Sequence, residues 1–415
     1  MVLIAQGREM IRKNARRVLY FLCLVFLLTA CSAVSNPETD ALQVGKPCRF
    51  SLEDLGNPEL YEHFSFTIDE NYFYYMGNFK GGNDASGVSY TVYRRPLAVL
   101  TKQSQSEKLT EATVDYVPGA LYAERGKIYL YYYTGGATMG SGHLYEIKES
   151  GQVREIGHGK FSYFDFDEFQ IKTPELVPPE PFKMTYEDQN GTRRLGEEGY
   201  CYRASYLGVG RGYADVWEQR LYCLAYQEVA GISYDCHICE VDLQTGATTP
   251  ISRPTATNFK IVDGIAYYSC YDKPAGTRDT RPHLYALDLS NKQEHYLGAV
   301  GMAEQTVVYA ATKNGVYYRD ADSGHLIFAN RYTEEKEILN ASQKVKGLTE
   351  CSGYIVAYFE ETPENPYRLM VFAPSGQAMK QVYATADCSD KAVINADGLL
   401  VYRLEVTNQL VQVQL

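Results

Sequence analysis

Cys236 and Cys239, in the segment CHIC, are the pair of residues whose types and spacing best suit chemistry. Two such sulfur atoms bind zinc or exchange disulfides only where they converge on one point. The longer segment CHICEVDL aligns with HLYALDL at residues 283–289, which indicates a β-strand. Residues three apart on a strand face opposite sides, with Cα atoms ~10 Å apart, too far for a disulfide. We therefore predict no metal or redox site at this pair.

Three further segments contain residues that are typical of functional sites, but the surrounding sequence does not suit that chemistry. The segment 320–324, DADSG, resembles a calcium loop but lacks the third acidic position and the distal Glu, and a hairpin turn explains its Asp and Gly equally well. The glycines at 208, 210 and 212 precede strand-like YADVW, so the helix N-terminus that would bind phosphate is missing. The sequence around Ser141 is not a nucleophile elbow. We predict no metal and no cofactor.

The N-terminal residues 1–30 have the pattern of an export signal. Basic residues precede an apolar run at 18–28, which is too short for an ordinary spanning helix. The ending Leu-Thr-Ala-Cys31 resembles the bacterial lipobox, and this resemblance implies that Cys31 is the first mature residue and carries lipid on its sulfur. A plain signal peptide with a chance cysteine is the alternative, and Met10 is an alternative start to Met1.

The charge of the mature chain limits its partners. The net charge is −11 for the full chain and +4 for residues 1–30, so removing the signal leaves about −15. A surface this acidic is a poor nucleic-acid binder and is repelled by anionic headgroups. The lipid would therefore hold the protein on the extracytoplasmic side of the bacterial cell membrane. Residues 31–47 are small and polar and are interpreted as a tether to a folded domain at 48–415.

The elements that position any site belong to a repeated module. Tyrosine occurs 37 times against 16 Phe and one Trp, which favours an all-β protein. Each module has a Gly, Asn or Asp turn, a Tyr-rich strand, a variable loop, a further strand often ending L-Y-x-x-D, and a shorter segment. Seven Tyr-rich strands are clear: YFYYMGNF, KIYLYYYT, RLYCLAYQ, GIAYYSCYD, GVYYRDADSG, GYIVAYFEE and GLLVYRLEV. An eighth, FSYFDFDEFQI, is weaker.

Four short strands in 40 to 50 residues are the anatomy of a β-propeller blade. In Ile265-Ala-Tyr-Tyr-Ser269 neither set of alternate residues is charged, as expected where blades pack on both faces. The 368 residues from 48 to 415 give 46 per blade for eight blades, although only seven motifs are clear. We predict seven or eight four-stranded antiparallel blades, with Ala392–Leu415 supplying three strands of the last and Cys48–Leu55 the fourth.

The D-G-x-x-Y-Y and L-Y-x-x-D elements resemble those of bacterial secreted or lipid-anchored β-propellers, a family largely of unknown function. The resemblance covers nearly the whole mature chain and implies the fold, but it implies no activity. Trp-Asp repeats, kelch double glycines and sialidase Asp boxes are missing from the sequence.

The other cysteines of an exported chain are open to oxidation. Cys48 and Cys388 flank the proposed ring closure, so a disulfide there is one hypothesis. Cys223 lies on the strand expected to pair with that of Cys236 and Cys239, so one cross-strand bridge is another. Buried thiols acting as small apolar side chains are the alternative.

The loops between the second and third strands should all leave one face of the propeller. They are long and rich in Gly and polar residues, and binding usually resides on such loops. Our candidate ligand-binding residues there are Asn78, Asn83, Asp84, Thr134, Tyr234, Asp272, Arg278, Arg281 and Asn365.

These loops favour a binding or scaffolding module for a protein, peptide or glycan. One alternative is a polysaccharide- or peptide-processing lyase or hydrolase with carboxylates converging in the central channel. Another is an accessory subunit of an envelope machine, which exposed apolar side chains on the rim would favour.

Overall fold

The computed structural model describes residues 46–415 with gaps. The residues outside the description are 52–64, 82–86, 101–105, 115–118, 125–126, 135–140, 160–162, 167–168, 173–183, 189–190, 196, 198, 203–213, 219, 228–235, 272–280, 304–305, 332, 334, 376–377, 390, 406 and 408. Along several strands, most of them between residues 124 and 227, only the backbone is described. The predicted signal peptide, Cys31 and most of the tether lie outside these residues. Within the described part, no helix is long and apolar enough to cross a membrane.

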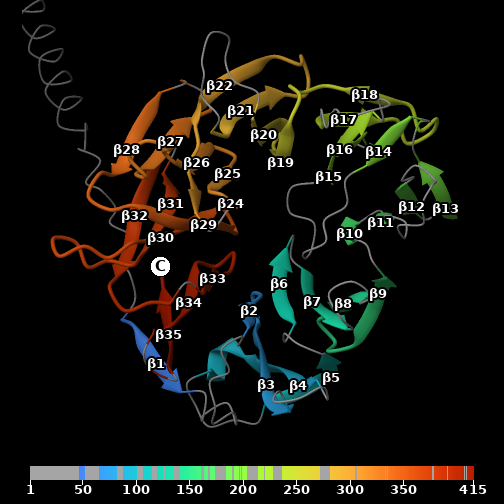
Figure 1. Ribbon diagram of the computed structural model, residues 1–415. Coiled ribbons are helices and arrows are strands. Elements are labelled where there is room, and N and C mark those ends of the chain that lie inside the picture. Colours follow the sequence, from blue (N-terminus) through green and yellow to red (C-terminus); the bar gives the residue numbers. More distant parts are fainter. Residues whose placement is uncertain are drawn as a thin grey trace, which may run out of the picture. The chain divides into compact units, whose positions relative to one another are not determined.

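The described strands form eight antiparallel blades, so the predicted β-propeller is confirmed and the blade number is eight (Figure 1). Blades one and two comprise β2 (Phe66–Ile68), β3 (Tyr72–Gly81), β4 (Val88–Pro96), β5 (Glu107–Val114), then β6 (Ala120–Glu124), β7 (Lys127–Thr134), β8 (Ser141–Ile147) and β9 (Val153–Gly159). Blades three and four comprise β10 (Tyr163–Phe166), β11 (Phe169–Lys172), β12 (Met184–Asp188), β13 (Gly191–Leu195), then β14 (Tyr200–Tyr202), β15 (Ala214–Trp217), β16 (Arg220–Gln227), β17 (His237–Val241) and β18 (Thr248–Pro250). The weak eighth motif is therefore blade three.

The second half of the chain continues the same order. Blades five and six comprise β19 (Ala256–Val262), β20 (Ile265–Cys270), β21 (His283–Asp288), β22 (Glu294–Ala299), then β25 (Tyr309–Thr312), β26 (Gly315–Arg319), β27 (Leu326–Asn330) and β28 (Lys336–Asn340). Blade seven comprises β29 (Val345–Cys351), β30 (Tyr354–Phe359), β31 (Leu369–Ser375) and β32 (Ala378–Thr385). A small hairpin of β23 (Met302–Ala303) and β24 (Thr306–Val307) lies between blades five and six, and a short 3-10 turn, η1 (Leu97–Val99), follows β4.

Blade eight closes the propeller with strands from both ends of the folded domain. Its order is β1 (Cys48–Ser51), β35 (Gln409–Gln414), β34 (Leu399–Arg403) and β33 (Ala392–Ile394), with β1 outermost. Phe50 of β1 is 3% exposed and packs edge-on against Phe73 of blade one, with ring centroids 5.9 Å apart. The Asn395 amide donates to the carbonyl oxygen of Asp69 at 3.0 Å, a second link to blade one. The predicted mixed closure is confirmed, with β1 ending at Ser51.

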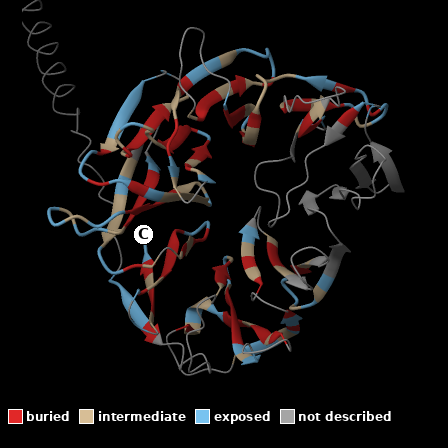
Figure 2. Cartoon of the chain, viewed as in Figure 1, coloured by how far each residue is buried: buried red, intermediate tan, exposed pale blue. Residues whose placement is uncertain are grey.

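The core lies between neighbouring blades, as the absence of charge from both strand faces predicted. One buried cluster joins Leu224 and Ile238 of blade four to Phe259, Tyr268 and Leu287 of blade five. Figure 2 shows buried residues concentrated along the strands, with most exposed residues at connections and outer strands. Tyrosine suits this packing because its ring fills the space between two sheets while its hydroxyl reaches a polar edge.

The Asp-Gly signals correspond to two-residue turns between first and second strands. Asp263 and Gly264 join β19 to β20 with φ of 51° and 77°, and Ser352 and Gly353 join β29 to β30 with φ of 51° and 84°. Two consecutive residues with positive φ make the turn whose twist matches that of the strands. The repeated turn chemistry therefore reports the hairpin that begins each blade.

The Cys48–Cys388 bridge is not formed, and Cys48 is an exposed unbridged thiol. Cys48 lies on the outermost strand of blade eight, whereas Cys388 packs with Ala392 and Ile394 of the innermost strand. Three inter-strand spacings amount to about 14 Å, twice the Cα separation that a disulfide tolerates. Both cysteines flank the closure in sequence, but they lie near opposite edges of the sheet that forms blade eight.

Cys223 lies directly opposite Cys239, as expected from the pairing of their strands, but no disulfide joins them. The Ile238 carbonyl accepts from Ile251 and the Ile238 N–H donates to Ser252, so Ile238 bonds toward β18 and Cys239 bonds toward β16. Cross-strand Cβ atoms are farther apart in such hydrogen-bonded pairs than in non-hydrogen-bonded ones. This spacing explains why both remain thiols, which favours the alternative of buried apolar cysteines.

Candidate functional site

The up-and-down order of the strands divides the connections into two sets. Links between second and third strands, and links from one blade to the next, leave one end of the strands, which we call the loop face. Turns between first and second strands, and between third and fourth strands, leave the other end, which we call the turn face. Most of the long connections belong to the loop face, although the ten-residue link 97–106 from β4 to β5 leaves the turn face. We therefore look for a site built on loops first on the loop face.

Three of the nine predicted ligand residues have described side chains: Asn78, Arg281 and Asn365. Thr134 is described in its backbone alone, where it pairs with Ser141. The other five lie outside the described residues: Asn83, Asp84, Tyr234, Asp272 and Arg278.

Asn78 lies within β3 and not in the loop that follows. Its φ is 55°, at an irregularity in the pairing of β3 with β4, and its side-chain amide donates to Thr91 Oγ1 at 3.5 Å. Asn tolerates this left-handed conformation better than most residues do. Backbone geometry thus accounts for this asparagine.

Arg281 links the loops of two blades. Its guanidinium forms an ion pair with Asp322 in the connection from β26 to β27, where the Arg281 side chain is half-buried and that of Asp322 is largely exposed. Asp320, two residues earlier, accepts from the Ser323 backbone N–H at 2.8 Å and from Ser323 Oγ at 2.7 Å. Burial would raise the pKa of Asp320, but these hydrogen bonds outweigh it and lower the pKa. The turn interpretation of the DADSG segment agrees with these contacts.

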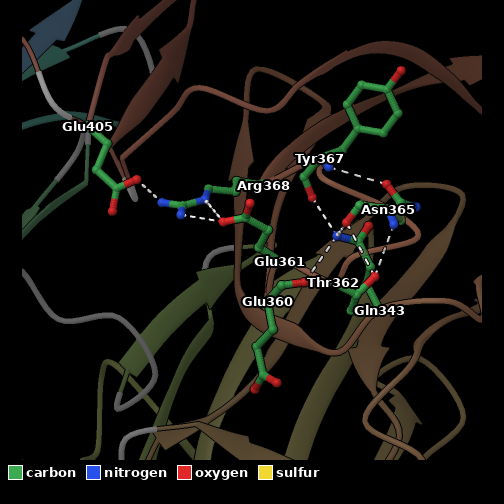
Figure 3. Close-up of polar contacts among 8 residues, drawn as sticks. All are labelled: Gln343, Glu360, Glu361, Thr362, Asn365, Tyr367, Arg368 and Glu405. Atoms are coloured by element: carbon green, nitrogen blue, oxygen red, sulfur yellow. Dashed lines mark hydrogen bonds and ion pairs between the residues drawn. The ribbon is translucent and has the colours of Figure 1, made fainter.

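The connection from β30 to β31, residues 360–368, is held by one buried side chain (Figure 3). Gln343 is 2% exposed, and its Nε2 lies 3.0 Å from the carbonyl oxygen of Glu360, 2.9 Å from that of Asn365 and 2.7 Å from that of Tyr367. Its Oε1 accepts from Asn340 at 3.1 Å. A single amide thus fixes both ends of a nine-residue loop, which we call the clamped loop.

Asn365 organises the clamped loop from within. Its Oδ1 accepts from the Tyr367 backbone N–H at 3.2 Å, and its Nδ2 donates to Ser342 Oγ at 3.0 Å. Its backbone N–H donates to Thr362 Oγ1 at 3.1 Å. The side chain that the sequence suggested as a ligand contact is therefore used to shape the loop.

Arg368 joins the clamped loop to blade eight. It donates from Nε to Glu361 at 3.1 Å and also forms an ion pair with Glu405, in the connection from β34 to β35. Figure 3 shows its guanidinium between the two carboxylates, and the Tyr367 ring pointing away from the Gln343 amide. The loops of blades seven and eight thus form one surface.

Exposed large hydrophobic side chains concentrate on the loop face. Among the described residues there are five, and three belong to its connections: Tyr271 at 42%, Met302 at 38% and Tyr367 at 43%. Tyr271 donates to the Met302 sulfur at 3.8 Å. The other two, Tyr296 and Ile338, lie on the outer strands β22 and β28. Single exposed apolar residues are ordinary, but aromatic and Met side chains on ordered loops are typical of binding surfaces.

Sequence reasoning missed the clamp and these apolar side chains. Tyr367 follows Pro366 in a loop, so its position outside any strand core was available from the sequence. Gln343 had no signal, because its partners lie 17, 22 and 24 residues away with no periodic pattern.

The inner strands, where a channel site would lie, contribute one ion pair of interest. Lys260 of β19 and Glu350 of β29 approach to 2.8 Å, joining blades five and seven. Glu350 Oε1 also accepts from the Gly353 N–H at 2.8 Å, so its carboxylate supports its own turn. Among the described residues, no group of three or more His, Cys, Asp or Glu is arranged to hold a metal ion.

No family model and no curated protein sequence matches this chain. Solved structures with a similar fold include BamB from Moraxella catarrhalis, at 11% identity and a TM-score of 0.45, covering 89% of this chain and 98% of that one. The β-propeller domain of the trilobed protease from Pyrococcus furiosus has 10% identity and a TM-score of 0.45, covering 77% and 97%. An oligogalacturonate lyase in complex with manganese has 12% identity and a TM-score of 0.40, covering 72% and 97%. Similarity this low carries no conclusion about activity or partner.

Proposed function

We propose that the protein is a lipid-anchored extracytoplasmic binding module that receives a protein or peptide on the loop face of blades five to eight. The observation that carries this proposal is the clamped loop, in which a buried amide orders the backbone beneath an exposed Tyr367. A loop ordered before binding loses less conformational entropy when a partner arrives. Tyr is also among the side chains that contribute most at protein interfaces.

Catalysis in the channel has weaker support. The one acid and base brought together on the described inner strands are Lys260 and Glu350, and Glu350 already accepts from Gly353. A general acid or base needs a proton-transfer atom that faces the substrate. Catalysis in the central channel is therefore the second candidate function.

Site-specific photocrosslinking tests the binding surface. A photoreactive amino acid replaces Tyr367 on the loop face, and in a matched variant it replaces Ala396, which is exposed on the turn between β33 and β34. We expect a discrete adduct in cells from position 367 and none of the same mass from position 396. The same amino acid placed at Tyr271 or Met302 samples the rest of the exposed loop face. Equal adducts from positions 367 and 396, or no adduct from any of positions 271, 302 and 367, would contradict the proposal.

The anchor is tested separately with Cys31→Ser. This substitution should release the protein into the soluble fraction, because the lipid and not surface charge holds it at the membrane. Membrane association that survives the substitution would show that another feature is responsible.

A further inference from the structure

We propose that β1 is a releasable strap, which detaches from β35 and rejoins it while the rest of the propeller stays folded. The folded protein then has two forms. In one form the outer edge of β35 is paired with β1, and in the other this edge is free. The inference concerns the closure of blade eight, so it is independent of the proposed anchor and of the proposed partner.

The first observation is the connectivity of β1. In each of the other seven blades the outermost strand follows its sheet neighbour directly along the chain. In blade eight, more than 350 residues separate β1 from β35, and residues 52–65 join β1 to β2 of blade one (Figure 1). No hairpin turn therefore holds β1 beside its partner strand. Rejoining remains intramolecular, and its entropy cost grows only slowly with the length of such a link.

The second observation is that one side chain anchors the strand. Phe50 is buried in a cluster with Phe73 and Leu410, whereas Cys48 and Arg49 are exposed. The remaining attachment is the backbone ladder, which has four register pairs between β1 and β35. One buried ring and a short ladder contribute a small part of the free energy that holds eight blades together. The release of β1 therefore costs less than global unfolding.

The third observation is that blade eight contacts both of its neighbours without β1. Toward blade one, the Asn395 amide donates to the Asp69 carbonyl oxygen at 3.0 Å. Toward blade seven, the Ala392 N–H donates to the Tyr358 hydroxyl at 2.9 Å. One buried cluster also joins blade seven to β33, β34 and β35, and it includes no residue of β1. These three strands therefore keep their place in the ring when β1 leaves.

The backbone bonds of β35 alternate between its two neighbours. The Leu404 N–H donates to the Gln409 carbonyl at 3.0 Å, and the Leu415 N–H donates to the Gly398 carbonyl at 2.9 Å. Hydrogen-bonded and non-hydrogen-bonded pairs alternate along an antiparallel ladder. The odd-numbered residues of β35 therefore bond to β34, and the even-numbered residues bond to β1.

Neighbouring amides of this one strand thus report different events. The N–H groups of Leu410 and Gln412 bond to β1 and are freed when β1 leaves. Those of Val411 and Val413 bond to β34 and are freed only when the blade itself opens. Amide exchange follows the free energy of the opening that exposes each group.

Hydrogen exchange of the full-length protein, resolved to single residues, tests the proposal. Rates are measured over a series of urea concentrations below the unfolding transition. After correction for intrinsic rates, we expect Leu410 and Gln412 to exchange on the order of 100-fold faster than Val411 and Val413. The faster pair should respond little to urea because release of β1 exposes little surface, whereas the slower pair should accelerate steeply.

Two outcomes in the parent protein would overturn the proposal. If all four amides share one rate and one urea dependence, β1 leaves only when the whole protein unfolds. If Gln412 exchanges fast while Leu410, opposite Phe50, is as slow as Val411, the strand frays at its Cys48 end and is not released as a unit.

Two substitutions of buried residues separate the two openings. Phe50→Ala should speed exchange at Leu410 and Gln412 by about tenfold or more, because it removes the ring that anchors β1. Val413→Ala, in the cluster shared with blade seven, should speed exchange at Val411 and leave Leu410 and Gln412 at their parent rates. Unchanged exchange at Leu410 in Phe50→Ala, or equal acceleration of Leu410 by both substitutions, would also overturn the proposal.

Discussion

Replacing Gln343 tests whether one buried amide orders the clamped loop. The Nε2 group has two N–H bonds and faces three carbonyl oxygens at 2.7–3.0 Å. The variant Gln343→Glu keeps the size of the side chain but directs a carboxylate oxygen at those carbonyls. Burial and carbonyl dipoles should raise the pKa of the new carboxyl group, and its protonation would restore one donor.

The size of the effect follows from the number of donors. Each buried neutral hydrogen bond contributes about 1 kcal/mol net, so losing two costs about 2 kcal/mol of loop stability. A free-energy change of about 2 kcal/mol corresponds to a roughly 30-fold faster exchange of amides that open with the loop. The Glu360 N–H, which donates to Lys344 at 2.9 Å, and the Arg368 N–H, which donates to Thr385 at 3.0 Å, are the reporters.

Hydrogen exchange followed by mass spectrometry at pH 5 and pH 8 measures this change. We expect the larger loss of protection at pH 8, where the new carboxyl group is ionised. Gln381→Glu is the matched control, because Gln381 is exposed on β32 of the same blade and should leave exchange in residues 360–368 unaltered. Unchanged exchange in Gln343→Glu, in a protein that keeps its global stability, would refute the clamp.

Three other measurements address closure, pH dependence and thiols. Phe50→Ala should lower the free energy of unfolding in urea by about 3–5 kcal/mol, because a fully buried ring at the closure is lost; a loss below about 1 kcal/mol would mean that β1 contributes little. Burial would raise the pKa of Glu146, but hydrogen bonds from Lys148 and Arg154 outweigh it and lower the pKa, so its stabilisation is present above the unfolded pKa of about 4.3 and is lost as pH falls through the folded pKa. Urea midpoints below pH 5 should therefore fall less steeply in Glu146→Gln than in the parent protein. Burial raises the pKa of the Cys239 thiol to about 12 and that of Cys223 as well, so both should resist alkylation in the native state while Cys48 reacts; early labelling of Cys239 would contradict the packing of blade four.

The fold could be predicted from the sequence because short-range sequence patterns specify it. Asp263-Gly264 marks a hairpin, and the uncharged faces around Tyr267 and Tyr268 mark a strand packed on both sides. Division of the length gave eight blades where motif counting gave seven, since blade three has a weaker pattern. The mixed closure followed from counting strands in the last unit.

The candidate site was harder to predict from the sequence, because its contacts join residues that have no periodic relation along the chain. The sequence identified the loop around Asn365 as a surface feature, but the role of Asn365 depends on Ser342 and Tyr367. Cys48 and Cys388 failed as a pair for a related reason: nearness to the closure in sequence did not say which edge of blade eight each would occupy.

The pairing of β1 with β35 has a consequence for how the molecule is made. In a chain exported from its N-terminus, β1 emerges first and β35 emerges last, so more than 350 residues must cross before the two strands meet. Until then the outer edge of β35 has no partner, and such an edge invites intermolecular association. Contacts this distant in sequence form slowly. In an exported chain, closure of blade eight is therefore the last step in the assembly of the propeller.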